Sequence, residues 1–200
     1  MSKYIILEGP ENSGKSTQVK NLIENLSHLQ FHKLHYSSLP FKNDTKKCQE
    51  YSLKLYSNMF KMLKELKTKD VNFILDRSHL GESVYSPLYR GYSGDYVFEL
   101  ESKYVDKLRD ELYLITLVND VDTLYDRNDG KSLYENKEQL SAEINGFEIA
   151  HRKSNIKNKL LINTSNMNPI QIRNIILDFI KTASTTNEEL QKINQLSLNI

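Results

Sequence analysis

The residues best suited to chemistry form one loop near the amino terminus, residues 9–16, with the sequence GPENSGKS. Its glycines, lysine and serine follow the spacing G-x-x-x-x-G-K-[ST]. In such a loop the glycines allow a tight turn, so that successive backbone N–H groups converge on one anion, and the positive end of the following helix adds to that field. Lys15 would then contact the β- and γ-phosphates, and the Ser16 hydroxyl would bind Mg²⁺.

The spacing therefore predicts a nucleoside triphosphate site. A simple strand–turn–helix explains the glycines, but it explains neither the lysine nor the serine that follow them. We expect the triphosphate to contact the loop and the residue after it, through Gly9, Asn12, Ser13, Gly14, Lys15, Ser16 and Thr17.

A second group of candidate residues, Asp76 and Arg77, directly follows the apolar residues 73–75. Ligands bind beyond the carboxyl ends of parallel strands, so we expect Asp76 to lie beside Lys15 and Ser16. A carboxylate there can hold Mg²⁺ directly or through a water. The planar guanidinium of Arg77 suits bidentate contact with phosphate. A surface ion pair is the alternative, and the preceding phosphate loop favours the site.

The hydrophobic pattern indicates the elements that would position these residues. Apolar runs predict strands at residues 3–7, 32–36, 71–75, 111–118 and 159–163. Helical periodicity predicts a helix after the loop, with apolar positions between residues 19 and 29, and further helices at residues 45–66, 139–158 and 170–180. Strands separated by helices predict an α/β fold, a three-layer sandwich whose parallel sheet of about five strands has helices on both faces. His32 and His35 are interpreted as structural or surface residues.

Composition excludes several classes of protein. The 200 residues carry 27 Lys and Arg against 26 Asp and Glu, a formal net charge of +1, so nucleic acid binding through a generally basic surface is not expected. No apolar run is long enough for a membrane span or the core of a signal peptide, so no membrane partner is expected. Cys48 is the single cysteine, which excludes an internal disulfide. We expect a reducing, cytoplasmic location, or a host cytoplasm if the protein is viral.

Several blocks of the sequence resemble the thymidylate kinases, a family of P-loop nucleoside monophosphate kinases. Residues 7–17 (LEGPENSGKST) resemble the family's first loop, including an acidic residue two places after its first glycine. Residues 76–78 (DRS), with Tyr85 after them, are similar to its Asp-Arg-aromatic motif and the Ala-Tyr that follows. Residues 90–91 fall where many bacterial members carry Arg-Gly, and residues 117–127 (LVNDVDTLYDR) look like the fourth strand and the arginine that opens the lid.

The resemblance implies transfer of the γ-phosphoryl group of ATP, with Mg²⁺ as cofactor, to a small nucleotide acceptor, dTMP or a related deoxynucleoside monophosphate. It implies catalytic roles for Lys15, Asp76, Arg77 and Arg127, and metal binding by Ser16 and Asp76. It implies acceptor contacts from Glu11, Tyr56, Arg77, Tyr85 and Arg90. It also implies a homodimer.

The loop that begins at Arg127 resembles the family's lid. The phosphate loop has no basic residue before Lys15, so we expect Arg127, together with Lys131, to meet the charge that develops on the transferring phosphoryl group. For Lys131 a solvated charged loop is the alternative. We thus expect one kinase domain at residues 1–182, with a lid at about 127–140, and a tail or peripheral helix at residues 183–200.

Three departures from the family pattern leave the acceptor base open. The family's Arg-x-Pro-Gly corresponds to residues 38–41 (SLPF), which lack an arginine. The helix that normally supplies a base-binding arginine corresponds to residues 51–60 (YSLKLYSNMF), where Tyr56 takes that position. Ser78 replaces the aromatic residue after Asp-Arg.

Two other functions are therefore considered. The first is a kinase of nucleosides, or of a modified-base hydroxyl in nucleotides or DNA. Residues 76–78 also resemble the Glu-Arg-Ser of deoxynucleoside kinases, but those enzymes carry a carboxylate base after the second strand, and residues 36–41 offer none. A non-catalytic nucleotide-binding module would be indicated by loss of Lys15, Ser16 or Asp76, and all three are present.

Overall fold

The predicted strands form a single sheet. In the computed structural model, which describes residues 2–36 and 44–197 (side chains as far as residue 185), the five strands lie in the order β2-β3-β1-β4-β5 and every neighbouring pair is parallel. The strands are β1 (Tyr4–Glu8), β2 (Phe31–His35), β3 (Asn72–Asp76), β4 (Leu112–Val118) and β5 (Asn158–Asn163). The predicted α/β fold with a parallel sheet is confirmed.

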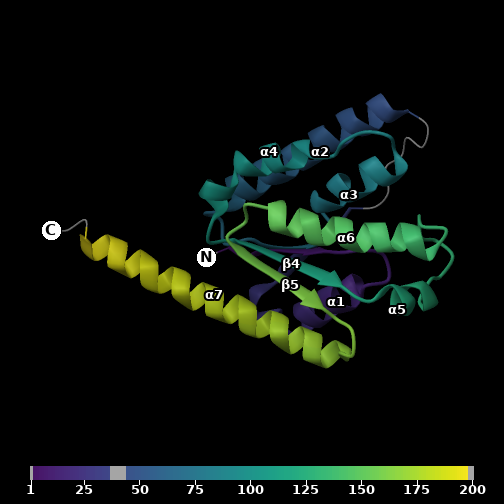
Figure 1. The fold of residues 1–200 in the computed structure, drawn as a ribbon. Coiled ribbons are helices and arrows are strands. Elements are labelled where there is room, and N and C mark those ends of the chain that lie inside the picture. Colours follow the sequence, from purple (N-terminus) through teal and green to yellow (C-terminus); the bar gives the residue numbers. More distant parts are fainter. Residues whose placement is uncertain (1, 37–43, 198–200) are drawn as a thin grey trace.

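Helices cover both faces of this sheet (Figure 1). Buried side chains from α2, α3, α4 and α6 form the core on one face, and those from α1 and α7 form the core on the other. Successive residues of β1 alternate between the two cores, as the two-residue period of a strand requires. The helices are α1 (Lys15–Asn25), α2 (Thr45–Leu66), α3 (Leu80–Tyr89), α4 (Tyr96–Ser102), α5 (Val121–Asp126), α6 (Lys137–Lys153) and α7 (Pro169–Ser197), with short 3-10 helices η1 (Ser27–Leu29) and η2 (Val105–Leu108).

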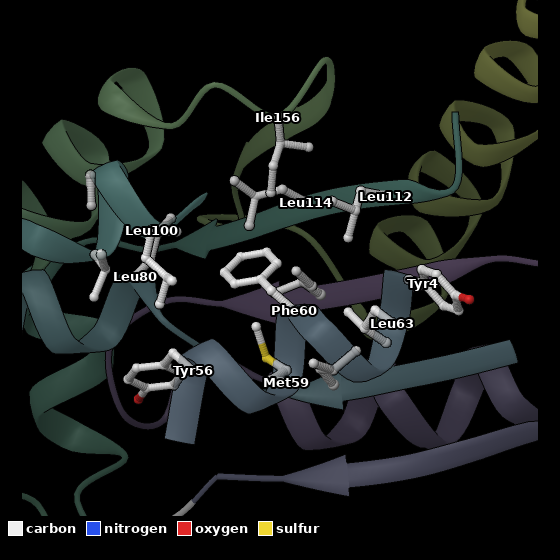
Figure 2. Packing of buried hydrophobic residues seen from close by; sticks show 14 of the residues in the cluster. Tyr4, Tyr56, Met59, Phe60, Leu63, Leu80, Leu100, Leu112, Leu114 and Ile156 are labelled. Atoms are coloured by element: carbon white, nitrogen blue, oxygen red, sulfur yellow. The ribbon is translucent and has the colours of Figure 1, made fainter. Parts of the chain in front are cut away.

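The packing of α2 fixes one wall of the functional region. Figure 2 shows Phe60 and Leu63 of α2 in the same buried cluster as Leu112 and Leu114 of β4. Each such side chain contributes about 1.5–3 kcal/mol when it is fully buried. Because α2 is rigidly packed through these residues, Tyr56, one turn earlier on the same helix, has a defined place near the carboxyl ends of the strands.

Helix boundaries follow local capping. The α2 helix has the predicted bounds, and the side chain of Asp44 caps it by accepting from the backbone N–H of Lys47 at 3.0 Å. The α6 helix begins two residues before the predicted 139, because Asn136 caps it by accepting from the N–H of Gln139 at 2.9 Å. It ends at Lys153 rather than 158, because the chain then turns into β5.

The last helix is longer than the pattern indicated. The α7 helix runs on past 180 to Ser197 and projects beyond the body of the molecule (Figure 1). The helix is continuous through residues 182–183, where the sequence analysis placed the end of the domain. Within the described residues no helix combines the length and apolarity that a membrane span requires.

Candidate active site

The phosphate loop connects β1 to α1 through backbone conformations that favour glycine. Gly9 has φ +139°, and a Cβ there would lie 2.1 Å from the carbonyl oxygen of Leu117 on β4. Gly14 has φ +91° and directly precedes α1. Asn12 adopts φ 60°, a left-handed conformation that asparagine tolerates. The loop therefore curls over the amino-terminal end of α1, where free N–H groups and the helix dipole favour an anion.

Lys15 folds back into this loop. Its ammonium Nζ donates to the carbonyl oxygen of Pro10 at 2.5 Å and to Ser13 Oγ at 3.3 Å. Burial lowers the pKa of Lys15 to about 8, with the nearby positive charge of Arg77 adding to the effect and the carboxylate of Glu8 opposing it. A bound phosphate would supply the negative charge that this buried cation lacks.

Asp76, at the end of β3, lies beside the loop because β1 and β3 pair in parallel register. Its Oδ2 accepts from Ser16 Oγ at 2.9 Å and lies 3.2 Å from Nδ1 of His35 and 3.5 Å from Nζ of Lys33. Burial acts to raise the pKa of Asp76, but the Ser16 hydroxyl and the charges of His35 and Lys33 outweigh it and lower the pKa. The carboxylate is therefore ionised at neutral pH.

The Asp76 and Ser16 oxygens fit a magnesium ion. The Asp76 Oδ1 atom is buried and has no hydrogen-bond partner among the described residues, while the Ser16 hydroxyl donates to the other carboxylate oxygen. Hard oxygen ligands of this kind, one or two from the protein, are what Mg²⁺ takes when substrate phosphates complete its shell.

Arg77 lies next to Asp76 in a strained conformation. Its φ is 73°, in the left-handed region that costs a non-glycine residue on the order of 1–3 kcal/mol. The backbone N–H donates to the carbonyl oxygen of Leu7 at 3.0 Å, which holds this turn against β1. The guanidinium Nη1 lies 3.3 Å from Glu11 Oε1, so a phosphate loop residue and the β3 turn meet through an ion pair.

Two cavities open over these elements. The first, of about 450 Å³, lies over the phosphate loop, the start of α1 and the loop after α5, and we term it the donor cavity. The second, of about 600 Å³, lies between the end of β2, α2 and α3, and we term it the acceptor cavity. Both cavities are lined by the same three charged side chains, Glu11, Arg77 and Lys131. The cavities thus meet at one acidic and two basic groups.

Most residues expected to bind the triphosphate lie at the donor cavity. Its walls include Asn12, Gly14, Lys15, Ser16, Thr17, Arg127 and Lys131. Ser13 is buried beneath it against Lys15, and Gly9 lines the acceptor cavity instead. The amide Nδ2 of Asn12 donates to Ser132 Oγ at 3.2 Å and to the Tyr134 hydroxyl at 3.3 Å, which ties the phosphate loop to the loop after α5.

The residues expected to bind the acceptor all line the acceptor cavity, and they belong to different walls of it. Glu11 and Arg77 lie where the two cavities meet, whereas Tyr56 belongs to α2 and Arg90 follows the end of α3. The Tyr85 hydroxyl is buried, and no described residue forms a hydrogen bond with it. Burial raises the pKa of Tyr85 well above its ordinary value, so the hydroxyl stays protonated.

Several residues at the cavities were not identified from the sequence. His35 contacts Asp76 because β2 pairs with β3 in a register that sets the two residues opposite each other, a contact that the sequence pattern did not indicate. Glu8 and Glu82, both buried, line the acceptor cavity, and the sequence analysis assigned neither of them a role. The SLPF segment, residues 38–41, lies outside the described residues.

Comparison with known proteins shows which solved structures share this fold. No family model matches the chain, and no curated protein matches it in sequence. Solved structures do match. The YorR protein of Bacillus subtilis, in complex with phosphorylated GDP, aligns with TM-score 0.65 and 19% identity over 90% of this chain and 96% of that one.

Two kinases give similar alignments. The thymidylate kinase of Candida albicans has TM-score 0.63 and 16% identity over 90% of this chain and 92% of that one. The deoxyadenosine kinase of M. mycoides, with the products dCMP and dCDP, has TM-score 0.58 and 18% identity over 90% and 99%. At these identities the likeness shows a shared fold, that of P-loop nucleotide and nucleoside kinases.

Proposed function

We propose that the protein transfers the γ-phosphoryl group of ATP to a deoxynucleoside monophosphate, dTMP or a related nucleotide. The observation that carries this proposal is the meeting of the donor and acceptor cavities at Arg77, Lys131 and Glu11. Two basic groups at that point would hold two phosphates near each other, which is the arrangement that direct phosphoryl transfer requires.

In the proposed reaction the loop and Lys15 bind the triphosphate of ATP. An oxygen of the acceptor phosphate forms a bond to the γ-phosphorus while the bond between that phosphorus and the bridging oxygen of ADP breaks, and ADP leaves. Arg77 and Lys131 stabilise the negative charge of the transferring group, and Arg127 adds a third cation from the donor side. Ser16 and Asp76 would hold Mg²⁺, which neutralises phosphate charge when bound.

A phosphate acceptor agrees with the charges at the junction of the cavities. A phosphate oxygen is already a nucleophile and needs no base to remove a proton, while it does need cations that bring two anions together. Arg77 keeps its charge at any physiological pH. Its contact with Glu11, at 3.3 Å, is long enough for a phosphate to compete for the guanidinium.

A hydroxyl acceptor, on a nucleoside or a modified base, is the second candidate. It is favoured by two carboxylates that line the acceptor cavity, Glu8 and Glu11. Burial raises the pKa of Glu8 although His79 and Lys15 oppose it, and a carboxylate with a raised pKa is a better proton acceptor. Either group could deprotonate a hydroxyl in this cavity.

The test is a coupled assay of ADP release with the five common nucleoside monophosphates of the deoxy series, the corresponding nucleosides, and duplex DNA. Turnover with monophosphates is expected. Turnover with nucleosides or DNA alone would replace the proposal with the second candidate, and ATP binding without any turnover would indicate a non-catalytic module.

Lys15→Ala should abolish turnover while the circular dichroism spectrum stays that of the native fold. Lys20→Ala is the matched control, because Lys20 lies on the same helix, 77% exposed, in a surface pair with Glu24. Activity retained by Lys15→Ala would show that the loop is not the donor site.

A further inference from the structure

A buried carboxylate in the acceptor cavity organises three side chains around it. Glu82 of α3 is 2% exposed, and its Oε2 accepts from Nη1 of Arg90 at 2.7 Å. Its Oε1 accepts from the hydroxyls of Tyr92 at 2.6 Å and Tyr96 at 2.9 Å. We term these four residues the Glu82 cluster. The two tyrosine hydroxyls orient the Glu82 carboxylate, and the carboxylate in turn orients Arg90 through one charge-assisted hydrogen bond.

Two members of the Glu82 cluster line the acceptor cavity. Glu82 and Arg90 line the cavity together with Tyr36, which follows the edge strand β2, and Tyr56 of α2. The rings of Tyr36 and Tyr56 lie 6.0 Å apart. These four residues line the acceptor cavity only, whereas the residues at the junction line both cavities. Aromatic rings at the wall suit a planar base.

Within the Glu82 cluster, Arg90 has more unused hydrogen-bond donors than Glu82 has unused acceptor sites. A carboxylate offers about four acceptor sites, and three of those on Glu82 are filled. A guanidinium has about five N–H donors, and in the described part of the chain Arg90 gives one of them, to Glu82. The pair is neutral overall and presents mainly donors to the cavity. A ligand group that meets this pair must therefore offer acceptors.

We propose that Arg90, held by Glu82, recognises the acceptor base through a carbonyl oxygen, so that thymine, uracil and guanine are preferred over cytosine and adenine. This inference rests on the proposed function, in which the acceptor is a nucleotide. The edges of the preferred bases carry O4 or O6, which accept from a guanidinium. At the same position cytosine and adenine carry an amino group. This amino group and the guanidinium are both donors, so they could not hydrogen-bond to each other, and a buried polar group would be left unpaired.

The test measures binding, so that it does not depend on turnover. Dissociation constants for dTMP, dUMP, dGMP, dCMP and dAMP are determined by isothermal titration calorimetry, with kcat/KM determined for the same five nucleotides. We expect the three keto nucleotides to bind at least about tenfold more tightly than the two amino nucleotides, the scale of one good polar contact. Arg90→Met should remove this preference, bringing the five dissociation constants within about threefold of each other.

Two further variants separate recognition from folding. Arg90→Met leaves the buried Glu82 without its cation, so the double variant Arg90→Met/Glu82→Gln, which buries no lone charge, is tested beside it and should show the same loss of preference. Tyr92→Phe, which removes one contact that orients Glu82, should weaken the preference without abolishing binding. Arg152→Met is the matched control, because the described ion pair of the Arg152 side chain is a surface contact with Glu148, and the variant should leave all five constants unchanged.

The outcomes distinguish this inference from the proposed function. A keto preference in binding that Arg90→Met removes, with no turnover, would support the inference and overturn the proposed function. Turnover of all five nucleotides without a base preference would overturn the inference alone. Equal weakening of all five by Arg90→Met would assign Arg90 to the phosphate or to the fold, and would also overturn it. Absence of binding by every monophosphate would overturn both.

Discussion

At the scale of single residues, burial changes the protonation and the hydrogen bonding of the charged groups at the site. Lys15 is a buried cation whose pKa burial lowers to about 8. Asp76 has one buried carboxylate oxygen to which no group in the described part of the chain donates. Under the proposed function a phosphate would be the further partner of Lys15 and a metal ion that of Asp76.

The affinity for ATP should fall as the pH rises through the pKa of Lys15. Below about pH 8 the ammonium is charged and binds phosphate, and above it the neutral amine does not. Between pH 8 and 9.5, where the phosphates are already ionised, we expect a loss of affinity of roughly tenfold. Calorimetric titration with ATP across this range measures it. Lys15→Arg, which does not titrate here, should remove the pH dependence, and a flat profile for the native protein would contradict the prediction.

A second buried group should make the stability of the protein depend on pH. Burial raises the pKa of Glu143 on α6 from 4.5 to about 7, although the hydroxyl of Tyr89, 2.6 Å away, opposes the rise. A carboxyl with a raised pKa in the folded state contributes full stability below its ordinary pKa, and that contribution is lost as the pH rises through about 7.

Glu143→Gln should therefore remove a decline in the free energy of unfolding on the order of 3 kcal/mol between pH 4.5 and pH 8. Urea unfolding at several pH values measures it. Glu138→Gln, on the exposed first turn of the same helix, is the control and should leave the decline in place. Parallel pH profiles for the native protein and Glu143→Gln would contradict the prediction.

At the scale of elements, the parallel sheet brings the candidate residues together. The register of β1 with β3 pairs Leu7 with Asp76, and that of β2 with β3 pairs His35 with the same residue. Three chain segments thus end at one edge of the sheet. The phosphate loop can lie there because Gly9 passes close to β4, where a side chain does not fit.

The two glycines of the loop should differ in their tolerance of alanine. A Cβ at Gly9 would overlap the carbonyl oxygen of Leu117, a backbone atom that moves only with β4, so Gly9→Ala should lose about 3 kcal/mol or more of stability. Gly14 has open space around its Cβ position, and Gly14→Ala should lose only the roughly 1–2 kcal/mol of a left-handed backbone. Urea unfolding of both variants measures the difference, and equal losses would show that packing against β4 is unimportant.

At the scale of the whole molecule, α7 continues past the body while its middle still packs against it. The hydroxyl of Ser184 accepts from Nζ of Lys3 at 2.7 Å and lies 2.9 Å from the hydroxyl of Tyr113 on β4. Ala183 packs against the core that α1 and α7 share. The contacts that join α7 to the sheet therefore extend beyond residue 182.

A chain that ends after residue 182 should be less stable than one that ends after residue 188. The shorter chain loses the Ser184 hydrogen bonds, each of which contributes about 1 kcal/mol, and the packing of Ala183. Thermal unfolding of the two truncated chains and of the full chain measures this. Ser184→Ala in the full chain should reproduce part of the loss, and equal stability of the two truncations would place the end of the folded domain at residue 182.

Features that depend on a few consecutive residues could be predicted from the sequence better than contacts between residues far apart in the chain. The strands, the phosphate loop and the bounds of α2 were predicted, because each rests on a pattern within a few consecutive residues. The predicted end of α6 was wrong, because helical periodicity does not mark where a neighbouring strand takes over. The last helix was predicted to end at residue 180 with a tail or peripheral helix after residue 182, and α7 continues as one helix to Ser197. The contact of His35 with Asp76 was missed because it joins residues 41 positions apart through strand pairing.

The sequence by itself determined the α/β fold of this protein and the glycine-containing turn between β1 and α1. Both depend on local properties: glycine allows a tight turn in the backbone, and the spacing of apolar residues indicates a strand or a helix. Only the tertiary structure decided that two cavities meet at Arg77 and Lys131, and that Glu82 holds Arg90 at the wall of one of them. Cavities and buried hydrogen bonds form between segments distant in the sequence, and their geometry depends on how helices and strands pack rather than on any local pattern.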